Sequence, residues 1–112
     1  MPLLTRMEEL LLLAVWNLQE KAYGLAVRRQ LSELLGRKIS VGAVYVPLER
    51  LVRKGMLSTE ESEPTQKRGG RRKRFYRLTA QGRRALLDIR TLHEEAWSKV
   101  IDPGLNPSPS RG

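Results

Sequence analysis

Nine cationic side chains and no acidic one lie between Pro64 and Leu87. The chain has 21 Lys and Arg residues, so twelve remain elsewhere, and the twelve Asp and Glu balance them. The formal net charge of +9 therefore comes entirely from this stretch. Guanidinium and ammonium groups at this density are the electrostatic footprint of a surface that binds a polyanion. The alternative is a solvated patch that only keeps the protein soluble.

The residue types that carry most enzyme and metal chemistry are scarce. The chain has no cysteine and a single histidine, His93. A disulfide scaffold, a thiol nucleophile and a Cys-ligated zinc site are therefore excluded. No Gly-rich phosphate loop and no nucleophile beside a base can be found in the sequence. We expect a protein that is not an enzyme and that has no cofactor and no metal.

No segment of the sequence is suited to a membrane. The longest apolar run covers residues 10–16, whereas a helix that spans a bilayer needs about 20 apolar residues. Acidic and polar residues flank this run on both sides, which does not fit a secretory signal. We expect a cytoplasmic protein without a membrane partner.

The N-terminal third of the chain predicts two helices. Thr5 followed by Glu8 forms a capping-box pattern, and apolar residues then surround the first helix on almost every side. A helix of this kind is central and buried, so we expect Trp16 in the core. A second periodic stretch ends at Gly36, which favours a left-handed C-cap. Residues 37–39 are predicted as a link that contributes one pair of strand residues.

A third helix and a hairpin follow. Ser40 is a suitable N-cap, apolar residues recur at helical spacing, and Gly55 ends this helix. Pro47 lies inside it and should bend it. Residues 56–63 and 74–78 are β-prone, and the segment between them has two glycines and no large apolar residue. They predict a long basic hairpin.

The last helix is expected to begin after Thr79 and to carry two neighbouring apolar stripes. Such a helix presents more apolar surface than one small domain can cover, which indicates a partner subunit. The complete pattern predicts a mainly α fold with a small β-hairpin, the winged helix-turn-helix, plus one C-terminal dimerisation helix. In that arrangement the third helix enters the major groove. We expect a DNA-binding domain over 1–78, a dimerisation helix over 79–101 and a disordered tail over 102–112.

Three segments resemble the PadR family of bacterial transcriptional regulators. They are Ala22-Tyr23-Gly24-Leu25 with Arg29 and Leu31; Ser40-Val41-Gly42-Ala43-Val44-Tyr45 through Leu48-Glu49-Arg50-Leu51 to Lys54-Gly55-Met56-Leu57; and Gly69-Gly70-Arg71-Arg72-Lys73-Arg74-Phe75-Tyr76-Arg77-Leu78-Thr79 to Gly82-Arg83-Arg84-Ala85-Leu86. The chain departs from the family pattern at two positions. Ala43 stands where threonine is common, and Val46 separates Tyr45 from Pro47.

The resemblance implies a homodimeric repressor that binds a palindromic operator on double-stranded DNA. A single C-terminal helix resembles the short subfamily, in which the last helix of each subunit packs against the first helix of its partner. Some relatives hold a planar apolar small-molecule effector between the subunits, near an aromatic residue of the last helix. In this chain the matching position is Trp97, with His93 one turn earlier. Packing in the dimer remains the alternative role for Trp97.

Residues of the expected third helix (40–54) and of the basic wing (64–74) form the predicted DNA contact. A glycine permits close approach of the backbone to phosphate, a methyl group can contact thymine, and a tyrosine hydroxyl can bond phosphate. An arginine beside a glycine tip can enter a narrow minor groove. The candidates are Ser40, Gly42, Ala43, Tyr45 and Arg50 on the helix, and Lys67, Arg68, Gly69, Gly70, Arg71, Arg72 and Lys73 on the wing.

Other functions remain open at this point. The same wing could serve a sequence-tolerant nucleic-acid binder, either architectural or directed at RNA. A winged helix can also act as a protein-interaction module, with the basic hairpin against an acidic partner. Tyr45 could be a half-buried ring, and Lys67 to Lys73 could be a solvated loop.

Overall fold

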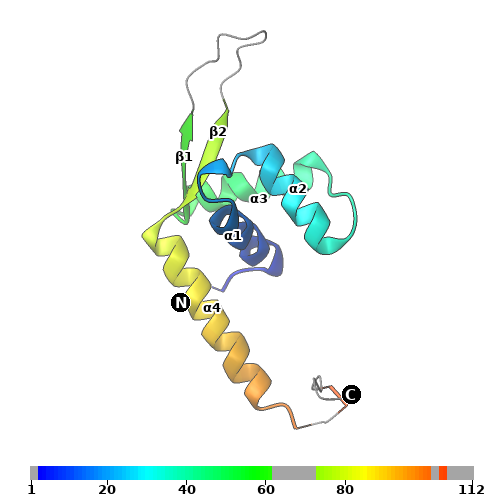
Figure 1. The fold of residues 1–112 in the computed structure, drawn as a ribbon. Helices are drawn as coiled ribbons and strands as arrows, with labels where there is room; N and C mark the ends of the chain where they lie inside the picture. Colours follow the sequence, from blue (N-terminus) through cyan, green and yellow to red (C-terminus); the bar gives the residue numbers. More distant parts are fainter. Residues whose placement is uncertain (1–2, 62–72, 102–103, 106–112) are drawn as a thin grey trace.

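A computed structural model describes residues 3–61, 73–101 and 104–105 of the 112-residue chain. The elements follow in the order α1 (Arg6–Leu18), a 3-10 turn η1 (Gln19–Lys21), α2 (Gly24–Leu35), α3 (Val41–Arg53), β1 (Leu57–Glu61), β2 (Arg74–Leu78) and α4 (Ala80–Ser98). Three helices, an antiparallel hairpin and a last helix confirm the predicted mainly α fold (Figure 1). The predicted tail over 102–112 lies almost entirely outside the described residues.

The helix boundaries follow from the predicted capping side chains. The hydroxyl of Thr5 accepts a hydrogen bond from the Glu8 N–H at 3.0 Å, and the Glu8 carboxylate accepts one from the Thr5 N–H at 2.9 Å. Ser40 accepts from the third residue of its helix at 3.2 Å, and Thr79 accepts from the Gly82 N–H at 2.9 Å. Each bond satisfies a donor that the first turn of a helix leaves open. Local sequence therefore determines where α1, α3 and α4 begin.

The hairpin pairs Leu57 with Leu78 and Glu61 with Arg74. An isolated bridge between Tyr23 and Phe75 adds the segment before α2 to the free edge of β2. The strand pair that we predicted for residues 37–39 is wrong. The backbone polar groups of Ile39 bond to side chains of α2 and not to another strand. The Ser32 hydroxyl accepts a hydrogen bond from the Ile39 N–H, and Arg28 donates one to the Ile39 carbonyl.

The core lies between α1 and the two helices that follow it, and the hairpin closes one side. Its apolar side chains with the lowest exposure come from α1, α2, α3, β1 and Ala22: Leu11, Leu12, Val15, Ala22, Val27, Leu31, Val44, Leu48, Leu51 and Leu57. Pro47 is buried inside α3, which continues to Arg53. The prediction that α1 is buried on every side is wrong for Leu13, which is 39% exposed, and for Trp16, which is 46% exposed.

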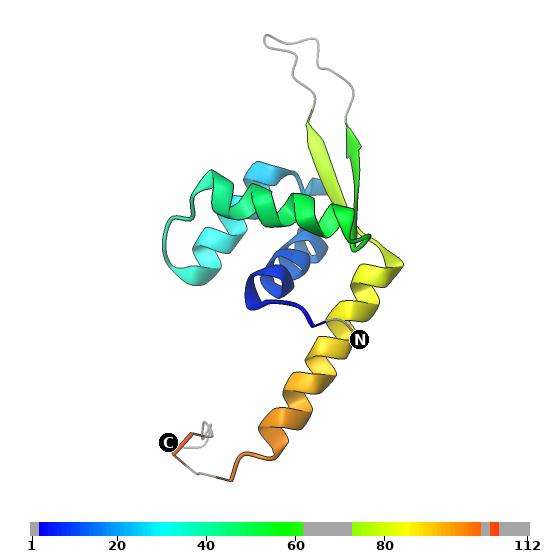
Figure 2. The same cartoon turned by 180° about the vertical axis from the view of Figure 1, so that it is seen from behind.

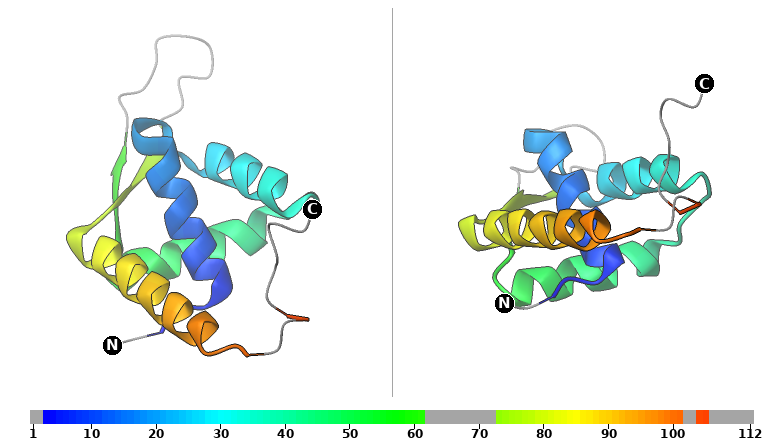
Figure 3. Two further views of the ribbon diagram at one scale, coloured as in Figure 1. Left: turned by 60° about the horizontal axis from the view of Figure 1, so that its bottom comes forward. Right: turned by 90° about the horizontal axis from the view of Figure 1, so that it is seen from below.

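α4 leaves the body on the side opposite the hairpin (Figures 1 and 2). The view from below in Figure 3 shows α4 running across this side of the body, and Figures 1 and 2 show its last turns extending beyond the other helices. Ile89 is the last buried residue of α4, whereas Leu92 is 39% and Trp97 is 50% exposed. This divergence explains the exposure of Leu13 and Trp16, because α4 does not lie flat over that face of α1.

Candidate nucleic-acid interface

The first turns of α3 present a small, uncharged surface to solvent. Ser40, Gly42 and Ala43 are exposed, whereas Val44 points into the core. Nothing lies within 4 Å of a Cβ placed on Gly42, so the backbone is open on this side. A helix that lacks bulky side chains at its exposed start can lie deep in a groove. The structure thus brings three predicted candidates together on one accessible face.

Val46 belongs to the same face and was missed by the sequence reasoning. It is 57% exposed, one helical turn after Gly42 and Ala43. An apolar side chain in this position can contact a thymine methyl group. Val46 follows Ala43 by three residues and Gly42 by four, and this helical spacing could have placed it on the same face. It was considered only as the residue that separates Tyr45 from Pro47.

Tyr45 lines an open hollow of about 430 Å³ between the start of α2, α3 and β2. Its ring lies so close to Gly24 that a Cβ there would overlap the hydroxyl and the ring. Across the hollow, Lys73 Nζ lies 4.3 Å from the centroid of the Tyr23 ring, which contacts Phe75 edge to face at 5.7 Å. Tyr45 is thus a half-buried ring that also borders the cationic strand.

A carboxylate connects α3 to β2 beside this hollow. Glu49 Oε2 accepts a hydrogen bond from Arg74 Nη1 at 2.7 Å and from the Tyr76 hydroxyl at 2.8 Å. Burial first, and then the bond to the carboxylate, raises the pKa of the Tyr76 phenol above its ordinary range. Tyr76 therefore stays protonated and remains a donor.

A second carboxylate connects the end of α3 to α1. Lys54 Nζ donates to Glu8 Oε2 at 2.8 Å, and the side chain of Glu8 is only 2% exposed. Burial alone would raise the pKa of Glu8, but the bonds from Lys54 and Thr5 and the nearby charge of Arg50 hold it below 4.5. Arg50 itself is exposed on α3, as an interface residue must be.

Most of the predicted wing lies outside the described residues. Lys67, Arg68, Gly69, Gly70, Arg71 and Arg72 belong to this group. Lys73 is described and exposed, immediately before β2. It lies with Arg74 at the edge of the hollow lined by Tyr45.

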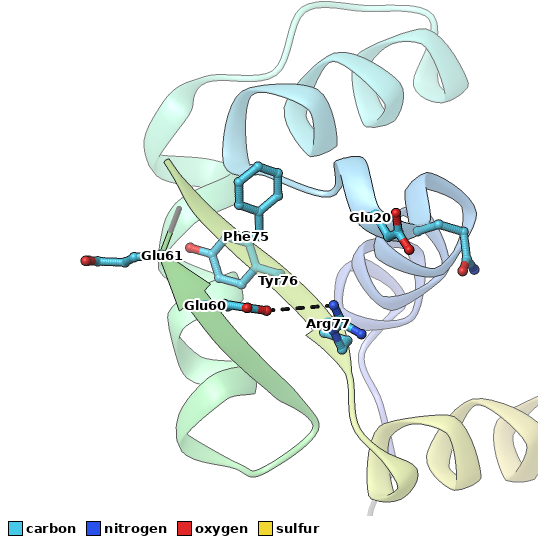
Figure 4. Close-up of a pocket in the computed structure, with 7 residues that line it drawn as sticks. Glu20, Glu60, Glu61, Phe75, Tyr76 and Arg77 are labelled. Carbon is cyan, nitrogen blue, oxygen red and sulfur yellow. Dashed lines mark ion pairs between the residues drawn. The ribbon is translucent and has the colours of Figure 1, made fainter. Parts of the chain in front are cut away.

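Another pocket, of about 310 Å³, lies between the hairpin and η1. In Figure 4, Glu60 and Arg77 point toward one another across the two strands, and their charged groups are 3.7 Å apart. Glu61 points away from this pair. Glu60 and Arg77 are both more than two-thirds exposed, so their ion pair contributes little to stability.

An apolar groove of about 400 Å³ separates α1 from α4. Leu13, Trp16 and Leu87 line it, Arg83 lies over the Trp16 ring at 5.7 Å, and His93 Nε2 lies 3.2 Å from Glu9 Oε1. The prediction of Trp16 as a core residue is wrong, because it forms a wall of this groove. Trp97, in contrast, is not among the residues that line it.

Neither a metal centre nor a membrane span is visible in the described part of the chain. The described residues hold no group of three or more His, Asp or Glu side chains placed to bind an ion. No described helix is long and apolar enough to cross a bilayer.

Fold and surface together define a winged helix-turn-helix transcription regulator that binds DNA. An exposed third helix and a cationic strand beside it are the two parts by which this class contacts a duplex. The chain belongs to the transcriptional regulator PadR-like family, whose sequence pattern matches residues 11–88. Members of this family are regulators and not enzymes.

Solved structures agree with this assignment. RosR of H. salinarum is 30% identical, the match covers 88% of this chain and 82% of that one, and the TM-score is 0.66. A PadR-like transcription factor from Bacteroides fragilis is 26% identical over 83% of this chain and 87% of that one, at a TM-score of 0.66. A PadR family regulator from Clostridium difficile R20291 shares the fold at a TM-score of 0.65. It is 24% identical, and the match covers 91% of this chain and 100% of that one. No curated protein sequence matches the chain significantly.

Proposed function

We propose that this protein is a homodimeric repressor that binds a palindromic operator through residues 40–54 and the basic wing 64–74. One observation carries the proposal: α3 has an exposed, uncharged start, and its Tyr45 shares an open hollow with Lys73 and Arg74, the cations at the beginning of β2. The first surface suits the floor of a major groove and the second suits phosphates. A two-fold dimer would present this pair twice, which matches the symmetry of a palindrome.

The individual contacts follow from exposure and chemistry. Ser40 and Gly42 lie where the backbone can approach a phosphate, and Ala43 and Val46 offer methyl groups to thymine. The Tyr45 hydroxyl would donate to a phosphate oxygen. Arg50 and the wing cations Lys67, Arg68, Arg71, Arg72 and Lys73 would supply the salt-dependent part of the affinity, with Gly69 and Gly70 at the tip.

The dimer would form through α4. Its exposed apolar side chains, Leu92 and Trp97, lie beyond the last residue that the body covers. Leu13 and Trp16 in the α1–α4 groove would add an apolar surface of α1 to the dimer interface. In this proposal residues 1–78 would bind DNA, residues 79–101 would form the dimer, and residues 102–112 would be a tail.

Selection of bound duplexes from a random pool tests this function. We expect a palindrome whose half-sites are about one helical turn apart. If four or five cations per subunit neutralise phosphates, a dimer releases roughly eight to ten counterions, and log K falls with log salt at a slope of about −7 to −9. Binding without sequence preference would favour an architectural or RNA-directed protein. No retardation of any duplex at low salt would favour a protein-interaction module.

A second, additional role is the binding of a planar apolar effector near His93, which lines the α1–α4 groove, and Trp97, which lies one turn farther along α4 and outside the groove lining. Trp16 in its wall and Trp97 farther along α4 are the only two tryptophans, so fluorescence can separate them. We expect a planar aromatic compound to quench emission in the parent and less in Trp97→Ala. Trp16→Phe is the matched variant, because it keeps an aromatic ring in the groove. Equal quenching by the parent and Trp97→Ala would exclude Trp97 from the site.

A further inference from the structure

Glu49 is the one residue of the DNA-facing helix whose charge has the wrong sign for DNA. It lies one turn beyond Tyr45 and Val46, and its side chain is 33% exposed. An acid beside a phosphate backbone weakens binding through repulsion, so simple electrostatics treats Glu49 as a liability. Its hydrogen bonds indicate a different role.

One oxygen of Glu49 holds two donors of the same strand. Arg74 Nη1 and the Tyr76 hydroxyl both bond Oε2, at 2.7 and 2.8 Å. Charge-assisted bonds of this length are stronger than bonds between neutral groups. The carboxylate therefore fixes β2 against α3 through two contacts that converge on one atom.

Tyr76 gives this connection a fixed end. Only 2% of Tyr76 is exposed, and its N–H donates to the Ala22 carbonyl at 2.8 Å. Its hydroxyl therefore cannot move far without disturbing the core. Arg74, at 42% side-chain exposure, is the more exposed partner, and its bond to Glu49 holds its guanidinium toward α3. Arg74 follows directly after Lys73, so the bond to Glu49 also restrains the backbone next to this second cation.

We propose that Glu49 is a positioning residue, which sets the cationic start of β2 against the groove-facing side of α3. The inference rests on the proposed DNA binding and concerns how its two contact surfaces are held in register. In this role the acid strengthens operator binding although its own charge opposes it. A purely electrostatic role predicts the opposite sign, since removing the acid would release Arg74 for a phosphate.

Two alanine variants that change the charge equally separate these roles. Glu49→Ala and Glu60→Ala each remove one acid, but Glu60 pairs only loosely with Arg77 across the hairpin. The probe is the duplex that the parent selects from a random pool. We expect Glu49→Ala to weaken binding about tenfold and to make the salt slope shallower by about 1 to 2, the loss of one or two phosphate contacts per dimer. Glu60→Ala should bind as well as the parent or more tightly.

The outcomes for Glu49→Ala are decisive in both directions. Equal or tighter binding with an unchanged or steeper salt slope would overturn the positioning role and leave the proposed function intact. A parent that selects no duplex would overturn both the function and this inference.

Two milder variants distinguish positioning from a loss of stability. Tyr76→Phe keeps the buried ring and removes only the hydroxyl, and Glu49→Gln keeps an acceptor oxygen without the charge. We expect both variants to unfold close to the unfolding temperature of the parent. Their affinity for the selected duplex should lie between that of the parent and that of Glu49→Ala. Hydroxyl-radical footprints should lose protection beside the hairpin and keep protection at the α3 contact. Loss of both protections in proportion would indicate a merely structural residue and overturn the proposal.

Discussion

The first turn of α4 and its last turns are in contrasting environments. At the start, Thr79 donates through its hydroxyl to the Gly55 carbonyl at 2.7 Å and through its N–H to the Met56 carbonyl at 3.1 Å. Gly82 packs so closely on Met56 that a Cβ would collide with its carbonyl oxygen. Toward the end, Leu92 and Trp97 are exposed, although both are apolar.

Under the proposed function, this difference would separate two roles within one helix. The anchored start ties α4 to the end of α3, the helix that we assign to the major groove. The projecting end presents apolar surface that the body does not cover, as expected of a surface that another subunit buries. Substitutions at the start should therefore act on the stability of one subunit, whereas substitutions at the end should act on association.

The largest effect is expected at the anchored start. In Gly82→Ala the added methyl group meets the Met56 backbone, which cannot withdraw as a flexible side chain would. We expect the free energy of unfolding to fall by about 2 kcal/mol, as in overpacked cores. Urea denaturation measures it. Gly42→Ala is the control, because open space surrounds it and alanine should stabilise α3 by roughly 0.5–1 kcal/mol. Equal stabilities of the two variants would contradict the tight packing.

Glu8→Ala should have the next largest effect. It removes the capping box of α1 and leaves Lys54 without its ion-pair partner at the end of α3. We expect a loss of about 2 kcal/mol or somewhat less, because Lys54 is itself partly exposed. Glu94→Ala, in the projecting half of α4, is the matched control. It removes an exposed pair with Arg90 and should cost no more than about 0.5 kcal/mol. If urea denaturation gave comparable losses in the free energy of unfolding for Glu8→Ala and Glu94→Ala, the two regions would not differ in stability as we propose.

Trp97→Ala should leave the subunit intact and weaken the dimer. Trp97 is 50% exposed, so removing its ring should change the free energy of unfolding of a dilute subunit by less than about 0.5 kcal/mol. Aromatic anchors contribute strongly to interfaces, and we expect the dimer Kd to rise about tenfold. Sedimentation at several concentrations measures the change. A variant that dimerises like the parent would exclude the end of α4 from the interface.

The smallest effect is a dependence on acid. The folded state favours the ionised form of Glu8, so the pKa of this carboxyl lies below its ordinary value of 4.5. Its contribution to stability is present above that pH and is lost as the pH falls through the lowered pKa. Stability should therefore decline more steeply below pH 4.5 in the parent than in Glu8→Gln. Parallel declines in thermal unfolding temperature would show that Glu8 is not the responsible group.

The parts of the fold that depend on neighbouring residues were predictable from the sequence. Thr5, Ser40 and Thr79 each bond an N–H within the next three residues, so a short pattern contains the whole interaction. The order of elements and the basic hairpin followed from periodicity and charge in the same way. The family assignment by sequence was also correct.

Interactions between distant residues could not be found in this way. The exposure of Trp16 depends on the direction in which α4 leaves the body, and an apolar periodicity does not determine that direction. Glu49 and Tyr76 are 27 residues apart, and no pattern marks a carboxylate that pairs across such a distance. The bridge from Tyr23 to Phe75 was missed for the same reason. The role of the wing tip remains a prediction.

α4 is also a lever. Its 19 residues, at 1.5 Å per residue, span about 28 Å from an anchored first turn. A rotation of about 10° at that turn would displace the far end by about 5 Å, close to one helical pitch. The same relation holds in reverse. In the proposed dimer, a small shift where two such helices meet would reach the two copies of α3 through Thr79 and Gly82. It would change their spacing, which must match the half-sites of the proposed operator.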